Sequence, residues 1–274
     1  MSASDLTTLA QVQAWAGTLA AGNSEQTVAL IGAISDQILG ELARDTVLPY
    51  AYSETLDGEG QPSIMLRRWP VLSVTSLVID GQAIPAAAPN AIGVTAGSGW
   101  LLAAADPFPP GRQQILSLVG CRRFCRGRQN VTVSYVAGYQ VTGEPATVPV
   151  GGAVKAKQSL GAWASDQGVT YASNGAALTA VSGAPAQGQY SVAVGSYTFA
   201  AADAGASVLI SYGFIPQALA MAAAQWVAES ISYSQRIGIR TKTLGGQETI
   251  AYDTAPMPGR VDKMLQPYRR VTLL

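Results

Sequence analysis

The stretch Leu66-Arg-Arg-Trp-Pro-Val-Leu-Ser-Val-Thr-Ser-Leu-Val-Ile-Asp-Gly81 decides the structure of the middle of this 274-residue chain. Its part from Val71 to Ile79 is rich in Val, Leu and Ile, residues that favour β-strands. Asp80-Gly81 follows directly, and this pair tolerates the positive φ angles of a tight turn. We therefore predict a strand over 71–79 that ends in a turn.

More strands are expected on both sides of it. Asn130–Val136 alternates apolar and polar residues and is followed by Gly138-Tyr139. The segment Glu54–Gly60 contains Asp57-Gly58, which predicts a second hairpin turn. Because several short strands separated by turn residues are typical of antiparallel sheets, we predict an antiparallel β domain over 50–149.

Helical periodicity brackets this β region. Apolar residues recur at spacings of three and four over 5–20 and again over 24–44, where Ser24 is a suitable N-cap. Pro216 is well placed to begin a third helix that ends before Gly238. A short fourth helix is predicted over 259–266, where Pro267 ends it. Both ends of the chain are therefore expected to be helical, with an extended arm or hairpin over 237–252.

Residues 150–213 are interpreted as a β domain inserted between these parts. Strands are predicted over 190–194, 195–199 and 207–212, separated by Gly and Asp. The end of the last one, Gly213-Phe214, repeats the strand exit at Gly138-Tyr139. This repeated Gly-aromatic pair predicts that the inserted domain begins and ends at equivalent points of the chain.

Composition points toward an oligomer. Charged residues make up only 12% of the chain, and 17 basic residues balance 17 acidic ones. A surface so poor in charge suits lateral packing against further copies. The charges are nevertheless segregated: residues 1–60 hold eight acids against one base, a net charge of −7, and residues 61–128 hold seven bases against two acids, a net charge of +5. Such segments can pair within one molecule or across a subunit boundary.

The chain contains no histidine and two cysteines, Cys121 and Cys125. Catalytic sets that need His are thereby excluded, and two Cys are too few for a structural zinc site. We expect no enzyme activity, no cofactor and no metal, and either reduced thiols or a short-range disulfide at the two Cys. The sequence shows no signal-peptide pattern and no apolar run long enough to span a membrane. We therefore expect a protein that is assembled in a cytoplasm.

The segment Arg122-Arg123-Phe124-Cys125-Arg126-Gly127-Arg128 concentrates positive charge. Guanidinium groups pair with phosphates, and the interleaved Phe could stack on a base, so this segment is a candidate contact for DNA. An acidic neighbouring subunit is the second possible partner, and a solvated basic hairpin is the plain alternative. The four candidate contact residues are Arg122, Arg123, Arg126 and Arg128.

The C-terminal residues after Pro267 form a short, partly apolar tail. Its arginines are followed by apolar residues at near-alternate positions, a pattern suited to an extended strand docked on a partner. The alternative is a tail held on its own domain. The candidate docking residues are Tyr268, Arg269, Arg270, Val271, Leu273 and Leu274.

Taken in order, several of these phrases resemble the head–tail connector (adaptor) proteins of tailed bacteriophages. They are the two opening helices, the phrase Trp69-Pro-Val-Leu-Ser-Val74, the strand before Gly138-Tyr139, and the closing Leu265-Gln-Pro-Tyr-Arg-Arg270. The resemblance covers about 1–149 and 214–274. It implies a ring, commonly of twelve subunits, that lies below the portal and lets the genome pass. It also implies that the C-terminal tail docks on the portal protein.

The resemblance and the residue patterns together predict an α+β fold. We expect a helical adaptor core of about four helices from 1–49 and 214–274, an antiparallel β domain over 50–149, and an inserted β domain over 150–213. The expected location is the virion neck, with the portal, a downstream neck or tail protein and, transiently, genomic DNA as partners, and no membrane. The alternative function is a host- or carbohydrate-binding β module of a phage tail or baseplate, marked by an aromatic-lined groove on 150–213.

Overall fold

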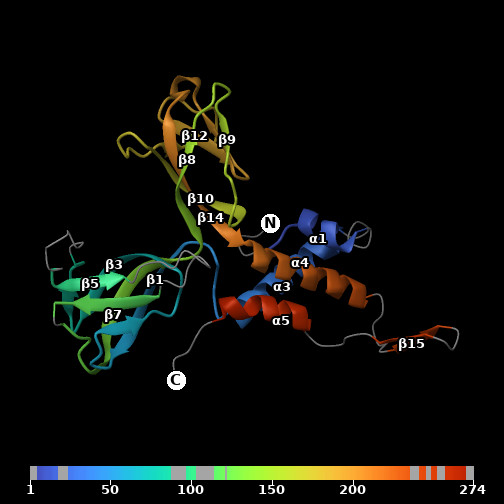
Figure 1. Cartoon of the computed structure of the whole chain (residues 1–274), viewed down its shortest axis with the longest axis horizontal. Helices are drawn as coiled ribbons and strands as arrows, with labels where there is room; N and C mark the ends of the chain where they lie inside the picture. Colours follow the sequence, from blue (N-terminus) through green and yellow to red (C-terminus); the bar gives the residue numbers. More distant parts are fainter. Residues whose placement is uncertain are drawn as a thin grey trace. The chain divides into compact units, whose positions relative to one another are not determined.

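The computed structural model of the chain describes residues 5–17, 24–87, 97–102, 114–120, 122–234, 241–244, 248–251 and 257–269 (Figure 1). The protein is mostly β, with 41% of residues in strands and 26% in helices. The predicted α+β fold around a helical adaptor core is therefore wrong. The reason is that strands follow one another almost without interruption from Tyr50 to Pro216, and this region also holds most of the buried apolar residues.

The chain divides into two compact units. One contains 1–45, 160–162 and 215–274 and is helical, and the other contains 46–159 and 163–214 and is built from strands. The second unit includes both the predicted β domain and the predicted insert. The helical unit thus combines the two ends of the chain.

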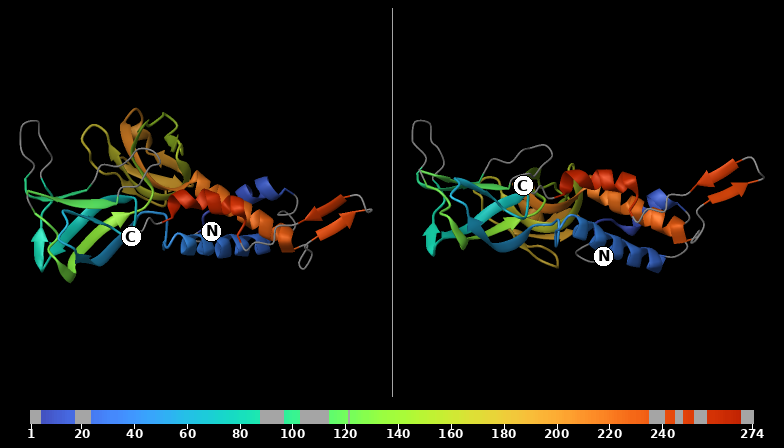
Figure 2. Two further views of the ribbon diagram at one scale, coloured as in Figure 1. Left: turned by 60° about the horizontal axis from the view of Figure 1, so that its bottom comes forward. Right: turned by 90° about the horizontal axis from the view of Figure 1, so that it is seen from below.

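Four helices make up the described part of the helical unit: α1 (Leu9–Ala16), α3 (Ser24–Glu41), α4 (Gln217–Ser234) and α5 (Gly259–Leu265). α4 packs against each of the other three, and Figure 2 shows α3 and α5 running alongside it. Its sequence is apolar on nearly every side, as expected of a helix surrounded by others. α1 begins at a capping box in which Thr8 and Gln11 satisfy each other's backbone N–H groups.

The short segment after α4 contains β15 (Thr241–Leu244) and β16 (Glu248–Ala251), which pair as an antiparallel hairpin. This agrees with the arm or hairpin expected over 237–252. After α5 the chain continues into a 3-10 turn, η2 (Gln266–Tyr268), so that Pro267 lies inside this turn.

The first β body holds two sheets. One has the order β1 (Tyr50–Gly58), β7 (Gly127–Ala137), β3 (Val71–Ile79), β4 (Gln82–Ile84), and every neighbouring pair is antiparallel. The other has the order β2 (Ser63–Met65), β6 (Ile115–Val119), β5 (Gly99–Leu102). Alternate residues of β7, from Val131 to Ala137, point into the core that the body encloses.

Two turn predictions in this body have different outcomes. Asp80 and Gly81 both adopt positive φ, 50° and 79°, and connect β3 to β4 as predicted. Asp57-Gly58, in contrast, does not turn, because β1 runs through it and pairs with β7. A Cβ atom at Gly58 would collide with the carbonyl oxygen of Cys125, so glycine is needed here for close approach of two backbones.

The second β body begins before residue 150. Its three-stranded sheet has the order β10 (Gly161–Tyr171), β14 (Ser207–Pro216), β8 (Gln140–Thr147), so β8 pairs with a strand of the predicted insert. A four-stranded sheet has the order β11 (Thr179–Ala180), β12 (Gln189–Ala193), β13 (Ser196–Phe199), β9 (Ala153–Lys155). The short 3-10 turn η1 (Ala201–Asp203) precedes β14.

The repeated Gly-aromatic phrases meet at one junction. The backbone N–H of Phe214 donates to the carbonyl of Tyr139 at 3.1 Å, and their rings lie 5.8 Å apart. A Cβ atom at Gly138 would collide with Leu48, and one at Gly213 would approach Pro49, so both glycines admit the same segment of chain. The chain therefore enters the second β body after Tyr139. It leaves that body at Phe214, which lies beside Tyr139.

Candidate interaction surfaces

The arginine-rich segment, residues 122–128, is a loop that continues into the first two residues of β7, and one of its side chains is buried. Phe124 is fully buried in the core of the first β body, which corrects the expectation that it stacks on a DNA base. Its backbone N–H donates to the carbonyl of Gln61 at 2.9 Å, and its carbonyl accepts from the N–H of Gly60 at 2.7 Å. The loop is thus fixed to the chain that follows β1.

Asn130 fixes the other side of this loop. Its side-chain oxygen accepts from the N–H of Gly58 at 2.9 Å, and its amide nitrogen donates to the Cys125 carbonyl at 3.0 Å and to Asp80 at 3.1 Å. Asp57 accepts from the N–H of Gln129. The carboxylates of Asp57 and Asp80 therefore accept hydrogen bonds from residues next to the loop.

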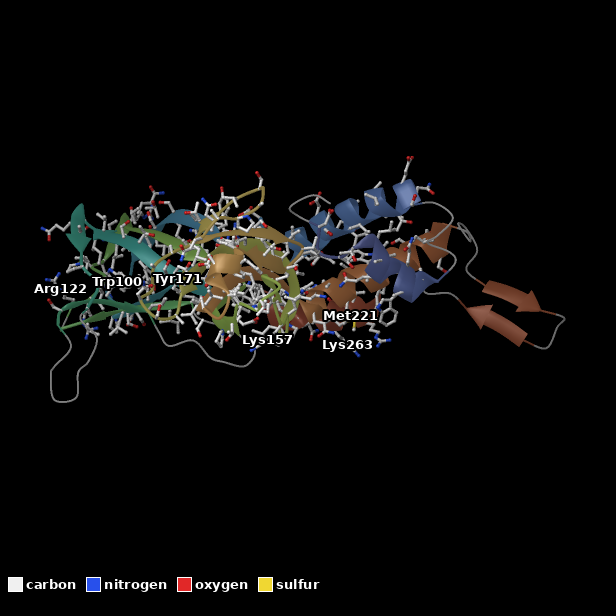
Figure 3. All side chains as sticks on the ribbon, turned by 90° about the horizontal axis from the view of Figure 1, so that it is seen from above. Trp100, Arg122, Lys157, Tyr171, Met221 and Lys263 are labelled. Carbon is white, nitrogen blue, oxygen red and sulfur yellow. The ribbon has the colours of Figure 1, made fainter. Side chains whose placement is uncertain are left out.

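The predicted contact residues of this loop all lie at the surface. Arg122, Arg123, Arg126 and Arg128 are exposed, and Figure 3 shows Arg122 at the end of the first β body. Arg123 donates weakly to the Gly60 carbonyl, at 3.4 Å. None of the carboxylates in the described part of the chain forms an ion pair with these four guanidiniums. Cys125 is a free, exposed thiol, and Cys121 lies outside the described residues.

The C-terminal docking residues are only partly described. Arg269 forms ion pairs with Asp262 at 2.8 Å and with Glu41 of α3 at 3.2 Å. Tyr268 is half-buried, and this burial raises the pKa of its hydroxyl. The start of the tail therefore lies on its own helical unit. The predicted contacts of Arg270, Val271, Leu273 and Leu274 lie outside the described residues.

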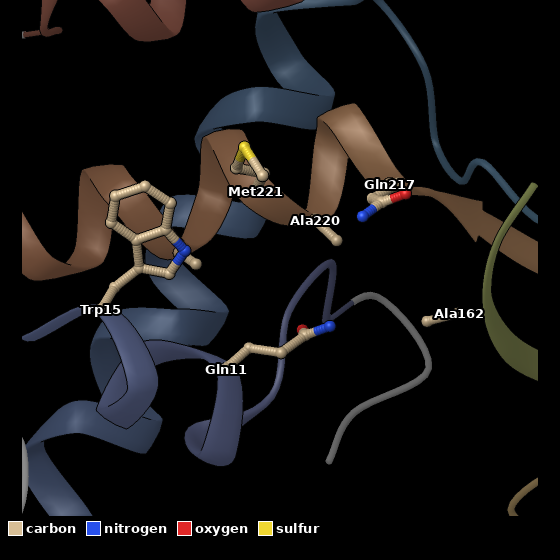
Figure 4. A pocket seen from close by; sticks show the side chains of 7 residues that line it. Gln11, Trp15, Ala162, Gln217, Ala220 and Met221 are labelled. Atoms are coloured by element: carbon tan, nitrogen blue, oxygen red, sulfur yellow. The ribbon is translucent and has the colours of Figure 1, made fainter.

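A shallow pocket of about 190 Å³ opens on the helical unit. Figure 4 shows Gln11 and Trp15 extending from α1, and Gln217, Ala220 and Met221 from α4. Trp15 is one of the apolar residues that recur at helical spacing over 5–20, and a stripe of this kind is expected to be buried. It is nevertheless 49% exposed, and Val28 of α3 is 48% exposed. The helical unit thus presents large apolar side chains to solvent. The periodicity could not reveal this, because an apolar stripe looks the same whether its own chain or a neighbour covers it.

Buried carboxylates bonded to tyrosines are a feature that sequence reasoning missed. In the second β body, Glu144 accepts from the Tyr212 hydroxyl at 3.0 Å and from the N–H of Lys157 at 2.9 Å. Three further carboxylates of the described residues also accept from tyrosines. Asp166, which is half-buried, accepts from Tyr190 and Tyr197, buried Asp203 accepts from Tyr171, and half-buried Glu54 of the first β body accepts from Tyr135. The members of each pair are far apart in sequence, so no local motif marks them.

These pairs are structural in character. Burial, followed by the hydrogen bond to Glu144, raises the pKa of Tyr212 to about 12, and burial likewise raises the pKa of Tyr135, Tyr190 and Tyr197. The hydroxyls therefore remain protonated donors at neutral pH, unsuited to act as bases. Within the described ranges, no group of three or more His, Cys, Asp or Glu side chains is placed to hold a metal ion.

Comparisons with known proteins supply no assignment. The sequence matches none of the protein-family models searched and none of the curated proteins. Among the helices described, none combines the length and apolar character needed to cross a membrane. The surfaces described above therefore have to carry the functional argument.

Proposed function

We propose that this chain is a virion structural protein, a head–tail connector subunit that assembles into a ring below the portal of a tailed bacteriophage. The genome would pass through this ring during packaging and ejection. Twelve copies, the portal protein and a downstream neck or tail protein are the partners that the sequence resemblance implies. Assembly in the host cytoplasm and residence in the virion neck belong to the same proposal.

The observation that carries the proposal is the apolar surface of the helical unit. Trp15 is half-exposed beside a shallow pocket, and Val28 is exposed to a similar degree. Exposed aromatic side chains next to a pocket are typical of protein–protein contacts. With only 12% charged residues in the chain, a neighbouring copy is a suitable cover for this surface.

A repeated contact of this kind favours a ring when it is heterologous, because one patch then meets a different patch on the next copy and the rotation closes. The C-terminal tail adds a contact to the portal in this proposal. Each copy would present the same short peptide, so that weak individual contacts would be multiplied by avidity. DNA contact would be transient and independent of sequence.

The alternative, a host- or carbohydrate-binding module, has less support. Its expected mark is an aromatic-lined groove on 150–213, a stretch that the structure describes completely. Tyr190, Tyr197, Phe199 and Tyr212 of this stretch are all buried. Buried rings cannot stack on a sugar, and the two half-buried aromatic residues of this stretch, Trp163 and Tyr171, donate their polar hydrogens to Tyr197 and Asp203.

The test is electron microscopy of the purified protein, alone at high concentration and mixed with the portal protein of the same phage. Class averages with cyclic symmetry are the expected result. Trp15→Ser should weaken the assembly without unfolding the subunit, whereas Tyr50→Ser, at an exposed ring in the first β body, is the control for general loss of an aromatic residue. Monomers only, or two-fold dimers only, under all these conditions would contradict the proposal.

A further inference from the structure

The arginine loop, residues 122–128, carries four like charges that form no ion pair with a described carboxylate. The four guanidiniums are exposed within seven residues, and the described part of the chain supplies no ion pair to any of them. Like charges at this spacing repel one another, and the contacts that hold the loop in place are made by the buried ring of Phe124 and by the side chain of Asn130. An anionic partner is the feature that this arrangement lacks.

The loop is also rigid enough to act as a docking element. Backbone hydrogen bonds join Phe124 to Gly60 and Gln61, and Asn130 bonds to Gly58 and Cys125. A preformed loop loses little conformational entropy when it binds, so its affinity for a complementary surface is higher. Arginine in particular forms bidentate hydrogen bonds with carboxylates and phosphates.

A surface complementary in charge and size lies on α3. Glu25 and Asp36 are exposed there and lie on the same side of the helix, since their separation of eleven residues is close to three full turns. The rise of a helix places them roughly 16 Å apart. Ala29, Ala33 and Gly40 lie on the same side and are small enough to allow close approach. We call these five residues the acidic stripe.

The greatest possible span of the loop is comparable to the length of the stripe. The chain from Arg122 to Arg128 spans at most roughly 20 Å, and the two carboxylates of the stripe lie roughly 16 Å apart. The chain as a whole has no net charge, and its acidic excess lies in residues 1–60, which include the stripe. A net-neutral chain is poorly suited to a polyanion such as DNA, and well suited to a second copy of itself.

We propose that the arginine loop of one copy docks on the acidic stripe of α3 in a second copy. The contact is heterologous, because a loop meets a helix, and it gives each ring interface a fixed polarity. This inference rests on the ring assembly proposed above and names its electrostatic contact. Exposed ion pairs contribute little individually, so the apolar surface around Trp15 supplies further affinity while the loop sets register and association rate.

The test uses two charge-reversed variants of the full chain. The first carries Arg122→Glu, Arg123→Glu, Arg126→Glu and Arg128→Glu, and the second carries Glu25→Lys and Asp36→Lys. Each should sediment as the 28.3 kDa monomer under low-salt conditions in which the wild-type chain self-associates. The control variant, Lys155→Glu with Lys157→Glu, reverses two exposed charges of the second β body and should associate like the wild type. Thermal melting checks that all the variants are folded.

Mixing the two charge-reversed variants is the decisive measurement. Because copies of the two variants can alternate, so that each interface joins either two wild-type surfaces or two reversed ones of opposite charge, an equimolar mixture should regain the sedimentation of the wild-type assembly. Restoration only when all six substitutions are combined in one chain would place the contact within a single molecule and overturn the proposal. Unchanged assembly of the loop variant would overturn it as well, and would leave the ring intact as a function.

Duplex DNA is the competing partner of the arginine loop. Its binding is followed by fluorescence anisotropy for the wild type and for the loop variant. Loss of DNA binding together with unchanged self-association would assign the loop to phosphates and overturn the proposal. A wild-type chain that remains monomeric at every concentration and on the portal would instead contradict the ring function itself.

Discussion

At the scale of single residues, Phe124 explains how a cluster of charges can be presented in a fixed position. The side chain is fully buried among the apolar residues of the first β body, while its sequence neighbours on both sides are exposed. One buried ring therefore holds the whole arginine loop against the domain. Burial of a side chain of this size stabilises the fold by roughly 2–3 kcal/mol, more than any exposed ion pair of the loop could.

Replacing Phe124 should therefore show that the stability of the fold depends on its buried ring and not on the charged residues beside it. We expect Phe124→Ala to lower the free energy of unfolding by about 3–5 kcal/mol, because it removes buried surface and leaves a cavity. Arg123→Ala, its exposed neighbour, should change the free energy of unfolding by less than about 0.5 kcal/mol. Chemical denaturation of both variants measures this difference, and equal losses for the two would contradict the anchoring role.

The buried tyrosines predict how the protein responds to alkali. The pKa of Tyr212 is raised from 10.0 to about 12, so its contribution to stability is complete below pH 10 and is lost as the pH rises toward 12. Tyr135, Tyr190 and Tyr197 are raised in the same direction. Tyrosinate absorbance followed together with circular dichroism should show that these buried tyrosines ionise only as the fold is lost. Ionisation of all 11 tyrosines before unfolding would contradict this.

At the scale of elements, the pairing of β8 with β14 decides where the second β body begins and ends. The boundary drawn from sequence at 149/150 separates two strands that share a ladder from Gln140 to Thr147. Unpaired, β8 would expose its backbone donors and acceptors along one side. The natural ends of this body are instead Tyr139 and Phe214, which are already hydrogen-bonded to each other.

Two deletions test this boundary. A chain in which Tyr139 is joined directly to Phe214 should stay folded, because the new bond connects residues that already lie side by side. A chain in which Pro149 is joined to Pro216 keeps β8 but loses its partner strand, and should be destabilised or aggregate. Thermal melting and size-exclusion chromatography measure both outcomes. Equal stability of the two shortened chains would mean that the β8–β14 pairing has no role in fixing the boundary.

At the scale of the whole molecule, the chain has a helical unit formed from its two ends and a strand-built unit formed from its middle. The first residues of the C-terminal tail contribute to the helical unit. Arg269 pairs with Asp262 and Glu41, and Tyr268 is half-buried, so these residues belong to the helical unit. The proposed docking on the portal is therefore assigned to residues 270–274.

Two truncations should separate these roles. Removing residues 270–274 is expected to abolish binding to the portal protein and to leave the melting temperature nearly unchanged. Removing residues 267–274 should also lower the melting temperature, because the Arg269 ion pairs and the packing of Tyr268 are lost. Binding that survives the shorter truncation would refute the docking role of the tail, and equal melting temperatures would show that the Arg269 contacts do not stabilise the unit.

Local patterns in the sequence predicted the local structure well. The strand over 71–79, the turn at Asp80-Gly81, the strand around 130–136 and the helix beginning at Ser24 all follow from propensities and turn chemistry that act within a few residues. The Asp57-Gly58 turn was wrong for an equally physical reason. That pair fits a tight turn, but pairing with β7 and the close approach of Cys125 hold it extended.

The sequence by itself therefore determined the alternation of helices and strands, the segregation of charge, and the concentration of arginines in one loop. Only the tertiary structure decided that the fold is mostly β, that β8 belongs with β14, and that Phe124 is buried while Trp15 is exposed. The physical reason is the separation along the chain over which each kind of interaction acts. Propensity and turn chemistry act between neighbours in the chain, whereas strand pairing, burial and buried carboxylate–tyrosine bonds join residues up to 81 positions apart, whose meeting no local pattern encodes.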